Sequence, residues 1–449
     1  MGLDLAGIFK AYDIRGLYPS ELDEGTAYRI GWGFARFVEA PRVAVGRDMR
    51  TSSPDLARAF AEGAMAAGCD VIDLGLLSTD GLYFASGLLE VPAAMFTASH
   101  NPAGYNGIKL CRGKAVPIGS DSGMAEIRVL AEAEPELQRD TRPGRLETRD
   151  VLEDYATHCR SFVDPSSLKP LKIAIDAGNG MAGKTVPVVF RDLPFEVVPL
   201  YFELDGTFPN HPANPIEPAN LVDLQKAVVD EGCVAGLAFD GDADRVFLID
   251  ELAEPVSGSL TTALVAERLL KRNPGEAILY NLICSWTVPE VVEENGGRPI
   301  RTRVGHSFIK AVMAETGAIF GGEHSGHYYF RDNFRADSGM IAALLVLEAM
   351  SEAGRPLSEL LAPYKRYVAS GEINSAVSDQ LGAIEKLSLS YADGKQDRTD
   401  GLTVAFEDWW FNCRASNTEP LLRLNLEART QEMMETKRDE VLALIREGN

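Results

Sequence analysis

Short apolar runs alternate with amphipathic stretches along most of this chain. The run VAVG at 43–46 is followed by small and apolar residues at helical spacing, which end near Gly68, and then by the apolar run VIDLG. This order predicts strand, helix, strand. Later apolar runs lead into the polar or glycine-rich segments TASHNP, DAGNG, DGDADR and GGEHSG. Such alternation predicts layered α/β units, whose ligands bind beyond the carboxyl ends of the strands.

Breaks in this pattern divide the chain. A polar segment at 134–150 separates the first α/β unit from the second, and a third unit contains the strand AILYN. A smaller last part begins at 362–374, where the later run LTVAFEDWWFNCRASNTEPLLRLNLEA predicts hairpin-like strands and the final stretch predicts a helix. The fold class we expect is α/β, with three successive mixed α/β domains and a smaller α+β C-terminal domain.

Composition and charge limit the partners. The 449 residues carry a formal net charge of -22 without a basic patch, which argues against nucleic acid and anionic membranes. The longest apolar runs, such as MIAALLVLEAM, are too short to span a bilayer, and the first residues do not form a signal peptide. We therefore expect a cytoplasmic protein that is a monomer or a weak dimer.

The cysteines are scattered and form no C-x-x-C pair. We interpret them as buried thiols in a reducing compartment rather than as a disulfide framework or a zinc site. The six are Cys69, Cys111, Cys159, Cys233, Cys284 and Cys413.

The segment FTASHNPAGYNGIKL places Ser99 at a strand end, followed by His100. A serine in this position can act as a nucleophile or carry a phosphoryl group. The simpler interpretation is a turn in which serine and asparagine side chains bond the backbone. This segment alone favours the turn.

The segment DGDADR places three alternating carboxylates, Asp240, Asp242 and Asp244, directly after an apolar strand. Oxygen ligands at this spacing suit Mg²⁺, which leaves room for phosphate oxygens. A solvated acidic turn is the alternative, but three carboxylates so close together repel one another without a counter-charge. The segment therefore predicts a magnesium site.

The segment GGEHSGHYYF combines Glu323, His324, Ser325 and His327 with glycines. Carboxylate and hydroxyl groups suit sugar hydroxyls, and imidazole suits proton transfer. The His-x-x-His spacing also fits zinc, but no third ligand accompanies it.

The segment RASNTEPLLR places Arg414, Ser416, Asn417, Thr418 and Arg423 around a predicted turn. Guanidinium groups, hydroxyls and backbone N–H groups bind phosphate dianions. An ordinary polar hairpin with flanking arginines explains the segment equally well.

Two further segments carry isolated polar residues. KAYDIRG contains Lys10, Tyr12 and Arg15, and VGHSFIK contains His306 and Lys310. Either group could be surface decoration.

The segment GNGMAGKT at 178–185 matches the nucleotide phosphate-loop pattern G-x-x-x-x-G-K-[ST]. It follows the predicted strand LKIAID, which is the context that the pattern requires. A sugar kinase is therefore one possible function, although this would leave TASHNP and RASNTEP unexplained.

Together, TASHNP, DGDADR, GEHSGH and RASNTEP, in this order, resemble the α-D-phosphohexomutase superfamily over essentially the whole chain. GEHSGHYYFRD resembles the phosphomannomutase branch, which includes dual phosphomannomutase/phosphoglucomutase enzymes. The resemblance implies four domains around a central cleft, which we place at 1–145, 146–252, 253–366 and 367–449. It also makes GNGMAGKT a D-x-G-N-G-like turn that opens the second domain.

The resemblance implies roles for these residues. Ser99 would be carried as phosphoserine, and the Mg²⁺ ligands would be Ser99, Asp240, Asp242 and Asp244. We take as catalytic Ser99, His100, Lys109, His327 and Arg15. We take as substrate-binding Tyr12, Arg245, His306, Glu323, Ser325, His327, Arg414, Ser416, Asn417, Thr418 and Arg423.

One departure from the family pattern concerns a strand end that resembles D-x-K-C-S. The stretch here is NLICS, with Asn281 and Ile283, so one cationic contact to the substrate is missing.

The expected function is that of a phosphomannomutase, which interconverts mannose 6-phosphate and mannose 1-phosphate through a phosphoserine and a hexose 1,6-bisphosphate. The bisphosphate serves as intermediate and activator, and a sugar phosphate is the only partner. A phosphoglucomutase or a dual-specificity mutase is the nearest alternative. A P-loop sugar kinase, a Mg²⁺-dependent phosphatase and a silent sugar-phosphate-binding protein are more distant ones.

Overall fold

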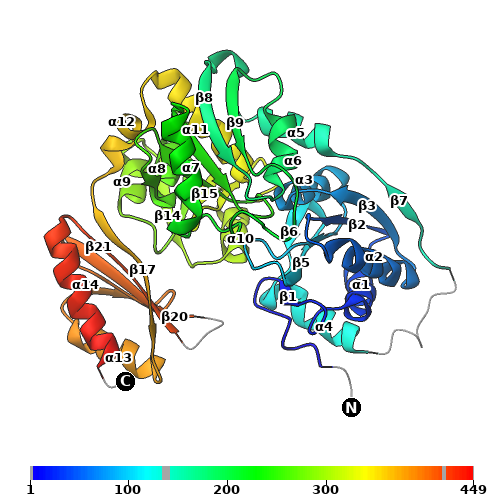
Figure 1. Ribbon diagram of the computed structural model, residues 1–449. Helices are drawn as coiled ribbons and strands as arrows, with labels where there is room; N and C mark the ends of the chain where they lie inside the picture. The colour runs from blue at the N-terminus through cyan, green and yellow to red at the C-terminus, as the bar shows by residue number, and fades with distance from the viewer. Residues whose placement is uncertain (1–3, 134–141, 417–420, 448–449) are drawn as a thin grey trace.

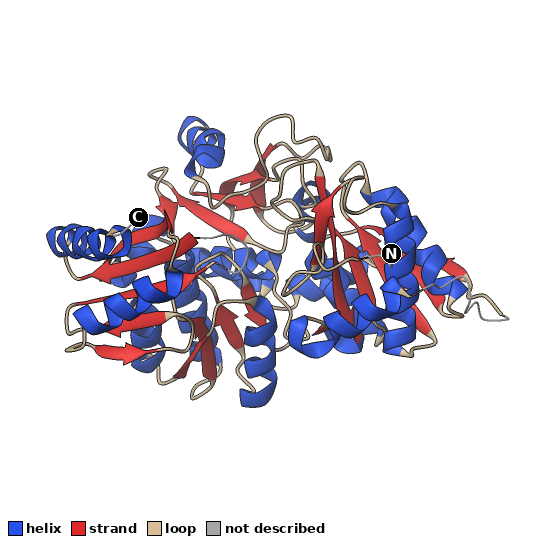
Figure 2. Ribbon diagram, turned by 90° about the horizontal axis from the view of Figure 1, so that it is seen from below, coloured by secondary structure: helices blue, strands red, loops and turns tan. Residues whose placement is uncertain are grey.

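The computed structural model describes residues 4–133, 142–416 and 421–447, apart from the side chains of residues 306 and 307. Four β-sheets follow one another along the chain, and we number the units built on them domains I to IV. In Figure 1 domain I lies on the right, domains II and III lie in the middle and upper left, and domain IV lies at the lower left. In Figure 2 helices lie outside the strands, and the two termini lie in different parts of the molecule.

Domain I has a mixed sheet in the order β1-β5-β4-β2-β3-β7, and β6 pairs with β5. β2, β3, β4 and β7 run parallel, whereas β5 is antiparallel to β4 and β1. Its strands are β1 (Ile14–Leu17), β2 (Arg42–Arg47), β3 (Asp70–Leu76), β4 (Ala93–Phe96), β5 (Tyr105–Arg112), β6 (Val116–Pro117) and β7 (Leu146–Thr148). Its α-helices are α1 (Glu24–Val38), α2 (Ser53–Ala66), α3 (Thr79–Leu89) and α4 (Ala125–Glu132).

Domain II has the sheet order β12-β11-β10-β8-β9, in which β8, β9 and β10 run parallel. Every residue of β10 is buried, as expected for a continuous apolar run in the middle of a covered sheet. The strands are β8 (Leu171–Asp176), β9 (Phe195–Leu200), β10 (Ala235–Phe239), β11 (Val246–Asp250) and β12 (Pro255–Val256). The α-helices are α5 (Leu152–Arg160), α6 (Ala182–Val189) and α7 (Val222–Asp230).

Domain III has the order β14-β13-β15-β16, with only the edge strand β16 antiparallel. The apolar run MIAALLVLEAM lies in α11, which is buried almost throughout because it is apolar on all sides. The strands are β13 (Ala277–Asn281), β14 (Arg298–Thr302), β15 (Phe320–Gly322) and β16 (Tyr328–Phe330). The α-helices are α8 (Gly258–Arg272), α9 (Thr287–Glu294), α10 (His306–Thr316), α11 (Gly339–Ala353) and α12 (Leu357–Leu361).

Domain IV is an antiparallel sheet in the order β17-β21-β20-β19-β18, packed against two helices. Its strands are β17 (Val368–Ala376), β18 (Lys395–Asp397), β19 (Leu402–Ala405), β20 (Trp409–Ala415) and β21 (Leu421–Ala428). Its helices are α13 (Gln380–Ser390) and α14 (Gln431–Arg446). The expected class, three mixed α/β units and a smaller α+β unit, is confirmed.

The hydrophobic cores show which domains are packed together. One cluster of buried residues runs through domains II and III, from Ile173 and Leu237 to Phe320 and Leu345. Domain IV has a separate core around Phe411. Domains II and III therefore form one packed body, and domain IV is a distinct unit beside it. Among the described residues, no helix is long and apolar enough to cross a membrane.

Candidate active site

Ser99 lies beyond the carboxyl end of β4, in the position that the strand pattern predicted. Its side chain is 4% exposed, and its backbone has a φ of 49°, a left-handed conformation that is unfavourable for a serine. The Ser99 hydroxyl donates to Asp240 Oδ2 at 2.6 Å and accepts from Arg245 Nη2 at 2.9 Å. Strained backbone of this kind persists where the surroundings hold it, and here it directs the hydroxyl at domain II.

Arg50 holds the Ser99 loop, and sequence reasoning missed it. This fully buried side chain follows β2 and donates to four backbone carbonyls, those of Ser99, Asn101, Pro102 and Tyr105, at 2.6–2.9 Å. Asp48 supplies its counter-charge at 3.3 Å. A planar guanidinium can make these bonds at once, whereas a lysine could not.

The acidic loop lies between β10 and the antiparallel β11, and its three aspartates are at most 1% exposed. Arg245, at the end of the loop, donates to Asp240 from its backbone and from Nε and Nη2. Burial raises the pKa of Asp240 to about 7, with Arg245 opposing the shift. Burial and the neighbouring Asp242 also raise the pKa of Asp244.

Two groups from domain I meet Asp242. Lys109 on β5 donates to Asp242 Oδ2 at 2.8 Å and to Asp244 Oδ2 at 2.6 Å. Thr79, the first residue of α3, donates its hydroxyl to Asp242 Oδ2 at 2.6 Å and its backbone N–H to the Asp242 carbonyl at 3.0 Å. Although burial acts in the opposite direction, Lys109 lowers the pKa of Asp242. In turn the two aspartates raise the pKa of Lys109 well above its usual value, against the effect of burial.

The acidic loop fits a divalent cation. One oxygen from each aspartate lies within 4.8 Å of the others. Asp242 Oδ1 and Asp244 Oδ1 are buried and have no hydrogen-bond partner among the residues that the structure describes. Oxygen-only donors suit Mg²⁺. Lys109 and Arg245 bring two positive charges to the three carboxyl groups, and a divalent cation would favour the ionised form of all three.

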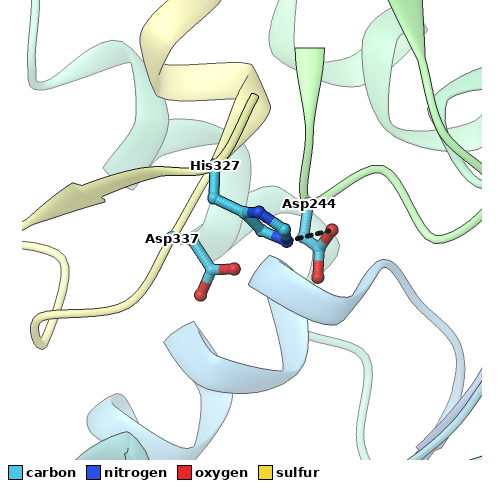
Figure 3. Close-up of side chains that lie close together, drawn as sticks. All are labelled: Asp244, His327 and Asp337. Atoms are coloured by element: carbon cyan, nitrogen blue, oxygen red, sulfur yellow. Dashed lines mark ion pairs between the residues drawn. The ribbon is translucent and has the colours of Figure 1, made fainter. Parts of the chain in front are cut away.

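The GEHSGH turn between β15 and β16 reaches the acidic loop. Arg245 and His327 form an isolated antiparallel β-bridge. Figure 3 shows the His327 ring directed at Asp244, with Asp337 nearby; His327 Nε2 lies 4.0 Å from Asp244 Oδ1. Ser325 bonds Glu323 at 2.9 Å and His327 Nδ1 at 3.1 Å. Despite burial, which opposes protonation, the hydrogen bond that His327 donates to the Glu323 carboxylate raises the pKa of His327.

His100 and Arg15 flank the serine. His100 Nδ1 lies 2.5 Å from Arg245 Nη2, and burial together with Arg245 lowers the pKa of His100 to about 2. His100 is therefore neutral and accepts a hydrogen bond from the guanidinium. Arg15 on β1 bonds Asp13 and Asn101, so its position is set within the Ser99 loop.

Lys310 differs from the surface decoration that its sequence context allowed. It is 2% exposed, pairs with Asp337 at 2.8 Å and lies 3.8 Å from the centroid of the Tyr83 ring. It thereby joins α10 of domain III to α3 of domain I.

The backbone of the acidic loop occupies the space inside the GNGMAGKT turn where a nucleotide phosphate would have to bind. Met181 N donates to the Gly241 carbonyl at 2.9 Å, and a Cβ at Gly180 would lie 2.7 Å from the same oxygen. Thr185 is fully buried and donates to the Met181 carbonyl. The turn therefore packs against the acidic loop, and its threonine is not placed to hold a nucleotide-bound metal.

In domain IV, Arg414 on β20 and Arg423 on β21 are directly opposed in the sheet. Glu372 on β17, which sequence reasoning missed, separates their charges: it accepts from Arg414 at 2.9 Å and lies 3.3 Å from Arg423. Ser416 lies 3.4 Å from Arg423 Nη2. Opposed like charges require such an anion.

Other predicted residues are spread over the domain interfaces. Tyr12 packs edge-on against Phe308 at 6.2 Å, which joins the N-terminal segment to domain III. Burial and then Asp400 raise the pKa of Tyr12. The Tyr12 hydroxyl lies 3.5 Å from the carbonyl of Val304, next to Gly305. Asn417, Thr418 and the side chain of His306 lie outside the described residues.

The zinc interpretation of His324 and His327 has no support in the geometry. His324 lines a cavity between domains III and IV together with Tyr364 and Trp410, whereas His327 faces Asp244. Ile283 lines the same cavity, so the position where the family often has lysine presents an apolar side chain here.

Comparison with known proteins gives the family. Models of the phosphoglucomutase/phosphomannomutase family match in chain order: alpha/beta/alpha domain I at residues 6–138, domain II at 153–253, domain III at 257–367 and the C-terminal domain at 372–444. Together they cover most of the chain.

Curated and solved relatives agree with these matches. A protein of Xanthomonas campestris named phosphohexose mutases is 42% identical over 443 residues, 98% of this chain and 99% of the relative. A phosphomannomutase of Escherichia coli is 40% identical over 451 residues, again 98% and 99%. A phosphoglucomutase/phosphomannomutase family protein from Burkholderia thailandensis superposes with a TM-score of 0.90 at 33% identity, over 99% of each chain. The chain therefore belongs to the phosphoglucomutase/phosphomannomutase family, and it is a phosphohexomutase, an intramolecular phosphotransferase.

Proposed function

We propose that the protein is a phosphomannomutase that carries its transferable phosphoryl group on Ser99. The observation that carries this proposal is the position of the Ser99 hydroxyl, buried between Asp240 and Arg245 at the junction of domains I and II. The curated relatives at about 40% identity include several phosphomannomutases, which supports mannose as the sugar.

In the first transfer, a free hydroxyl of mannose 6-phosphate attacks the phosphorus of phospho-Ser99. The bond from phosphorus to Ser99 Oγ breaks, a bond to the sugar oxygen forms, and the product is mannose 1,6-bisphosphate. The hydroxyl proton leaves the sugar, and a proton is restored to Ser99. After the bisphosphate turns end for end, the Ser99 hydroxyl loses its proton and its oxygen bonds the phosphorus at position 6. The bond from that phosphorus to the sugar oxygen breaks, the sugar oxygen takes up a proton, and mannose 1-phosphate leaves.

The residues of this chain serve that reaction by position and charge. His327, whose Nδ1 is held by Ser325, presents Nε2 toward Asp244 and is the candidate to take the hydroxyl proton. Lys109 is held protonated by Asp242 and Asp244, so it brings positive charge to the acidic loop, and it is the second candidate for proton transfer at the sugar hydroxyl. Arg245 bonds the serine oxygen and offsets charge that develops there.

The residues proposed to hold Mg²⁺ are Ser99, Asp240, Asp242 and Asp244. Bound there, the cation would neutralise charge on the transferred group. Magnesium at this site is favoured by two buried oxygens, one on Asp242 and one on Asp244, that have no hydrogen-bond partner among the described residues.

The phosphate that does not react is assigned to segment 414–423 of domain IV, which we call the clamp. Its described members are Arg414, Ser416 and Arg423. Tyr12, Arg15, Glu323 and Ser325 are assigned to substrate between the clamp and the acidic loop, and His306, Asn417 and Thr418 to the same path by sequence alone.

Phosphorus NMR tests the proposal. Mannose 1-phosphate is incubated with the protein, Mg²⁺ and a trace of glucose 1,6-bisphosphate without nucleotide, and glucose 1-phosphate is run in parallel. We expect the 6-phosphate signal to grow faster from the mannose substrate. Faster conversion of glucose 1-phosphate would make the protein a phosphoglucomutase, and release of inorganic phosphate would contradict the mutase mechanism.

A further inference from the structure

Asp80 on α3 is a buried carboxylate at which three domains meet. It is 0% exposed and accepts a hydrogen bond from one hydroxyl of each domain. Ser78 of domain I donates at 2.5 Å, Tyr155 of domain II at 2.5 Å, and Ser338 of domain III at 2.6 Å. Ser338 also caps α11, so the contact fixes the beginning of that helix.

Aromatic packing continues the junction along α3. One turn after Asp80, Phe84 packs on His158 of domain II with ring centroids 4.9 Å apart, and His158 stacks on Phe334 of domain III at 6.0 Å. A Cβ at Gly87 would lie 2.3 Å from the Phe334 ring, so α3 fits closely against domain III. The three domains therefore share one continuous contact at this helix.

The same end of α3 reaches the acidic loop. Thr79, next to Asp80, bonds both the carboxylate and the carbonyl of Asp242. The N-terminus of α3 thus faces an anion, which a helix dipole stabilises. On the other side, Gly339, which follows Ser338, is so close to the Arg245 backbone that a Cβ would lie 2.6 Å from its carbonyl carbon. Both neighbours of the Asp80 contact therefore touch the loop that carries Asp242 and Arg245.

We propose that Asp80 is a positioning residue of the mutase reaction: it joins domains I, II and III at one carboxylate and, through Thr79, fixes Asp242 in the acidic loop. The proposal rests on the proposed function insofar as that function gives Asp242 its role. In the described part of the chain no hydrogen bond joins Asp80 to Ser99 or to the loop carboxylates, so Asp80 acts through its neighbours.

The net stability that Asp80 contributes does not by itself explain a buried carboxylate at this position. It forms no ion pair with a lysine or arginine in the described parts of the chain, and burial raises its pKa to about 6. A buried carboxylate held only by hydroxyls contributes little net stability, because desolvation offsets the hydrogen bonds. What it supplies is geometry, since three hydroxyls from three domains must converge on two oxygens.

The test compares Asp80→Asn with a matched control. Asparagine keeps the volume but removes the charge and one acceptor oxygen. The control is Glu348→Gln, because Glu348 is also a fully buried carboxylate between domains, where it bonds Asp164 N and Arg268 away from the acidic loop. Thr79→Val and the Asp80→Asn/Thr79→Val double variant examine the route to Asp242.

Four quantities are measured on each variant: the melting temperature, kcat and KM for mannose 1-phosphate, the Mg²⁺ concentration for half-maximal rate, and hydrogen–deuterium exchange at residues 77–83 and 240–246. In Asp80→Asn we expect kcat to fall, or the Mg²⁺ concentration for half-maximal rate to rise, by about 10- to 100-fold, as for other residues that orient metal ligands. We expect KM to change little and exchange to rise in both segments. Glu348→Gln should lower the melting temperature and leave the other three quantities near wild type.

The double variant decides whether Asp80 acts through Thr79. Loss no greater than that of Thr79→Val alone supports the route, whereas additive losses would overturn it. The whole proposal is overturned if Asp80→Asn lowers only the melting temperature and leaves kcat, the Mg²⁺ requirement and exchange at 240–246 unchanged. If the wild-type protein converted neither hexose phosphate, the proposed function would fall, and the exchange comparison would still decide the role of Asp80.

Discussion

Ser99 and Arg414 are assigned to the two phosphates of one substrate, and the protein holds them by different means. Ser99 is bonded by residues of domain II, and its loop is bonded by a fully buried arginine through four backbone carbonyls. Arg414 lies in domain IV, which has its own core, and its main partner is a single glutamate that is 28% exposed.

The difference follows from what each end must do. The reacting phosphate needs one fixed geometry, because small misplacement of reacting atoms is costly in rate. The other phosphate belongs to position 1 in one half of the proposed cycle and to position 6 in the other, so its site must accept two orientations. Changes at the Ser99 end should therefore affect kcat, and changes at the Arg414 end should affect KM.

The largest effect is expected for Ser99→Ala. Removing the phosphoryl carrier should lower kcat more than about a thousandfold, because the two sugar oxygens cannot exchange a phosphoryl group directly. Phosphorus NMR of the hexose phosphates measures the rate, and unchanged binding of mannose 1-phosphate by calorimetry serves as the folding control. Near-normal turnover would remove the phosphoserine from the mechanism.

Arg50→Lys should come next, with kcat lower by about a hundredfold and KM little changed, because one ammonium cannot hold four carbonyls and the Ser99 loop would shift. Steady-state kinetics with mannose 1-phosphate checks this. Arg47→Lys is the matched control, since Arg47 is the last residue of β2, three positions before Arg50, and pairs with Asp73, which is 33% exposed. Equal effects in the two variants would contradict the special role of Arg50.

At the other end, Arg414→Ala should raise KM for the 1-phosphate and the 6-phosphate alike, by about 10- to 100-fold, with kcat less affected. Initial rates in both directions give the two constants. Arg429→Ala is the control, because Arg429 is an exposed arginine of the same domain that pairs with Asp408. A rise for one substrate only would mean that the clamp serves a single orientation.

Glu372→Gln should act in the opposite direction. Glu372 occupies the two arginines that a phosphate would need, so removing its charge should lower KM by about two- to fivefold. Inhibition by inorganic phosphate should tighten in parallel. A higher KM instead would show that Glu372 orients the arginines rather than competing with substrate. Glu385→Gln, at an exposed pair with Arg398, is the control.

The smallest effect is expected for His211→Ala, a change in a loop of domain II. His211 Nε2 lies 2.9 Å from Asp176, and this contact raises the His211 pKa although burial opposes it. A raised histidine pKa gives stability that is complete below about pH 6.5 and is lost as the pH rises through the raised value. Melting temperatures should therefore differ more from wild type at pH 5.5 than at pH 8.5, whereas an equal difference would show that the charge is unimportant.

The sequence predicted those parts of the site that directly follow apolar strands. Ser99 after β4, the aspartates after β10 and Glu323 after β15 could be found because strand ends converge in α/β layers. Arg50, Thr79, Asp80 and Glu372 could not, because their partners lie far away in the sequence: Thr79 and Asp242 are 163 residues apart, and Asp80 and Ser338 are 258. The partners of Arg50 and Glu372 lie in their own domains and depend on how distant segments pack there, whereas those of Thr79 and Asp80 depend on how domains dock. The local sequence pattern encodes neither.

The phosphate-loop match illustrates the opposite error. GNGMAGKT has the letters and the preceding strand of a nucleotide site, yet its Met181 N–H is bonded to Gly241. A sequence pattern shows which backbone N–H groups could bind a phosphate. Only the fold shows whether they already donate hydrogen bonds to another part of the chain.

The contact of Asp80 with Tyr155 and Ser338 also limits how this enzyme can be recombined. A chimera that takes domain I from one relative and domains II and III from another inherits the two halves of the contact separately. We expect such hybrids to be active only when domain I carries an aspartate at position 80 and domains II and III carry the hydroxyl groups of Tyr155 and Ser338. We therefore expect the three α/β domains to be exchangeable between relatives only together, and domain IV, which has its own core, to be the domain that tolerates separate exchange best.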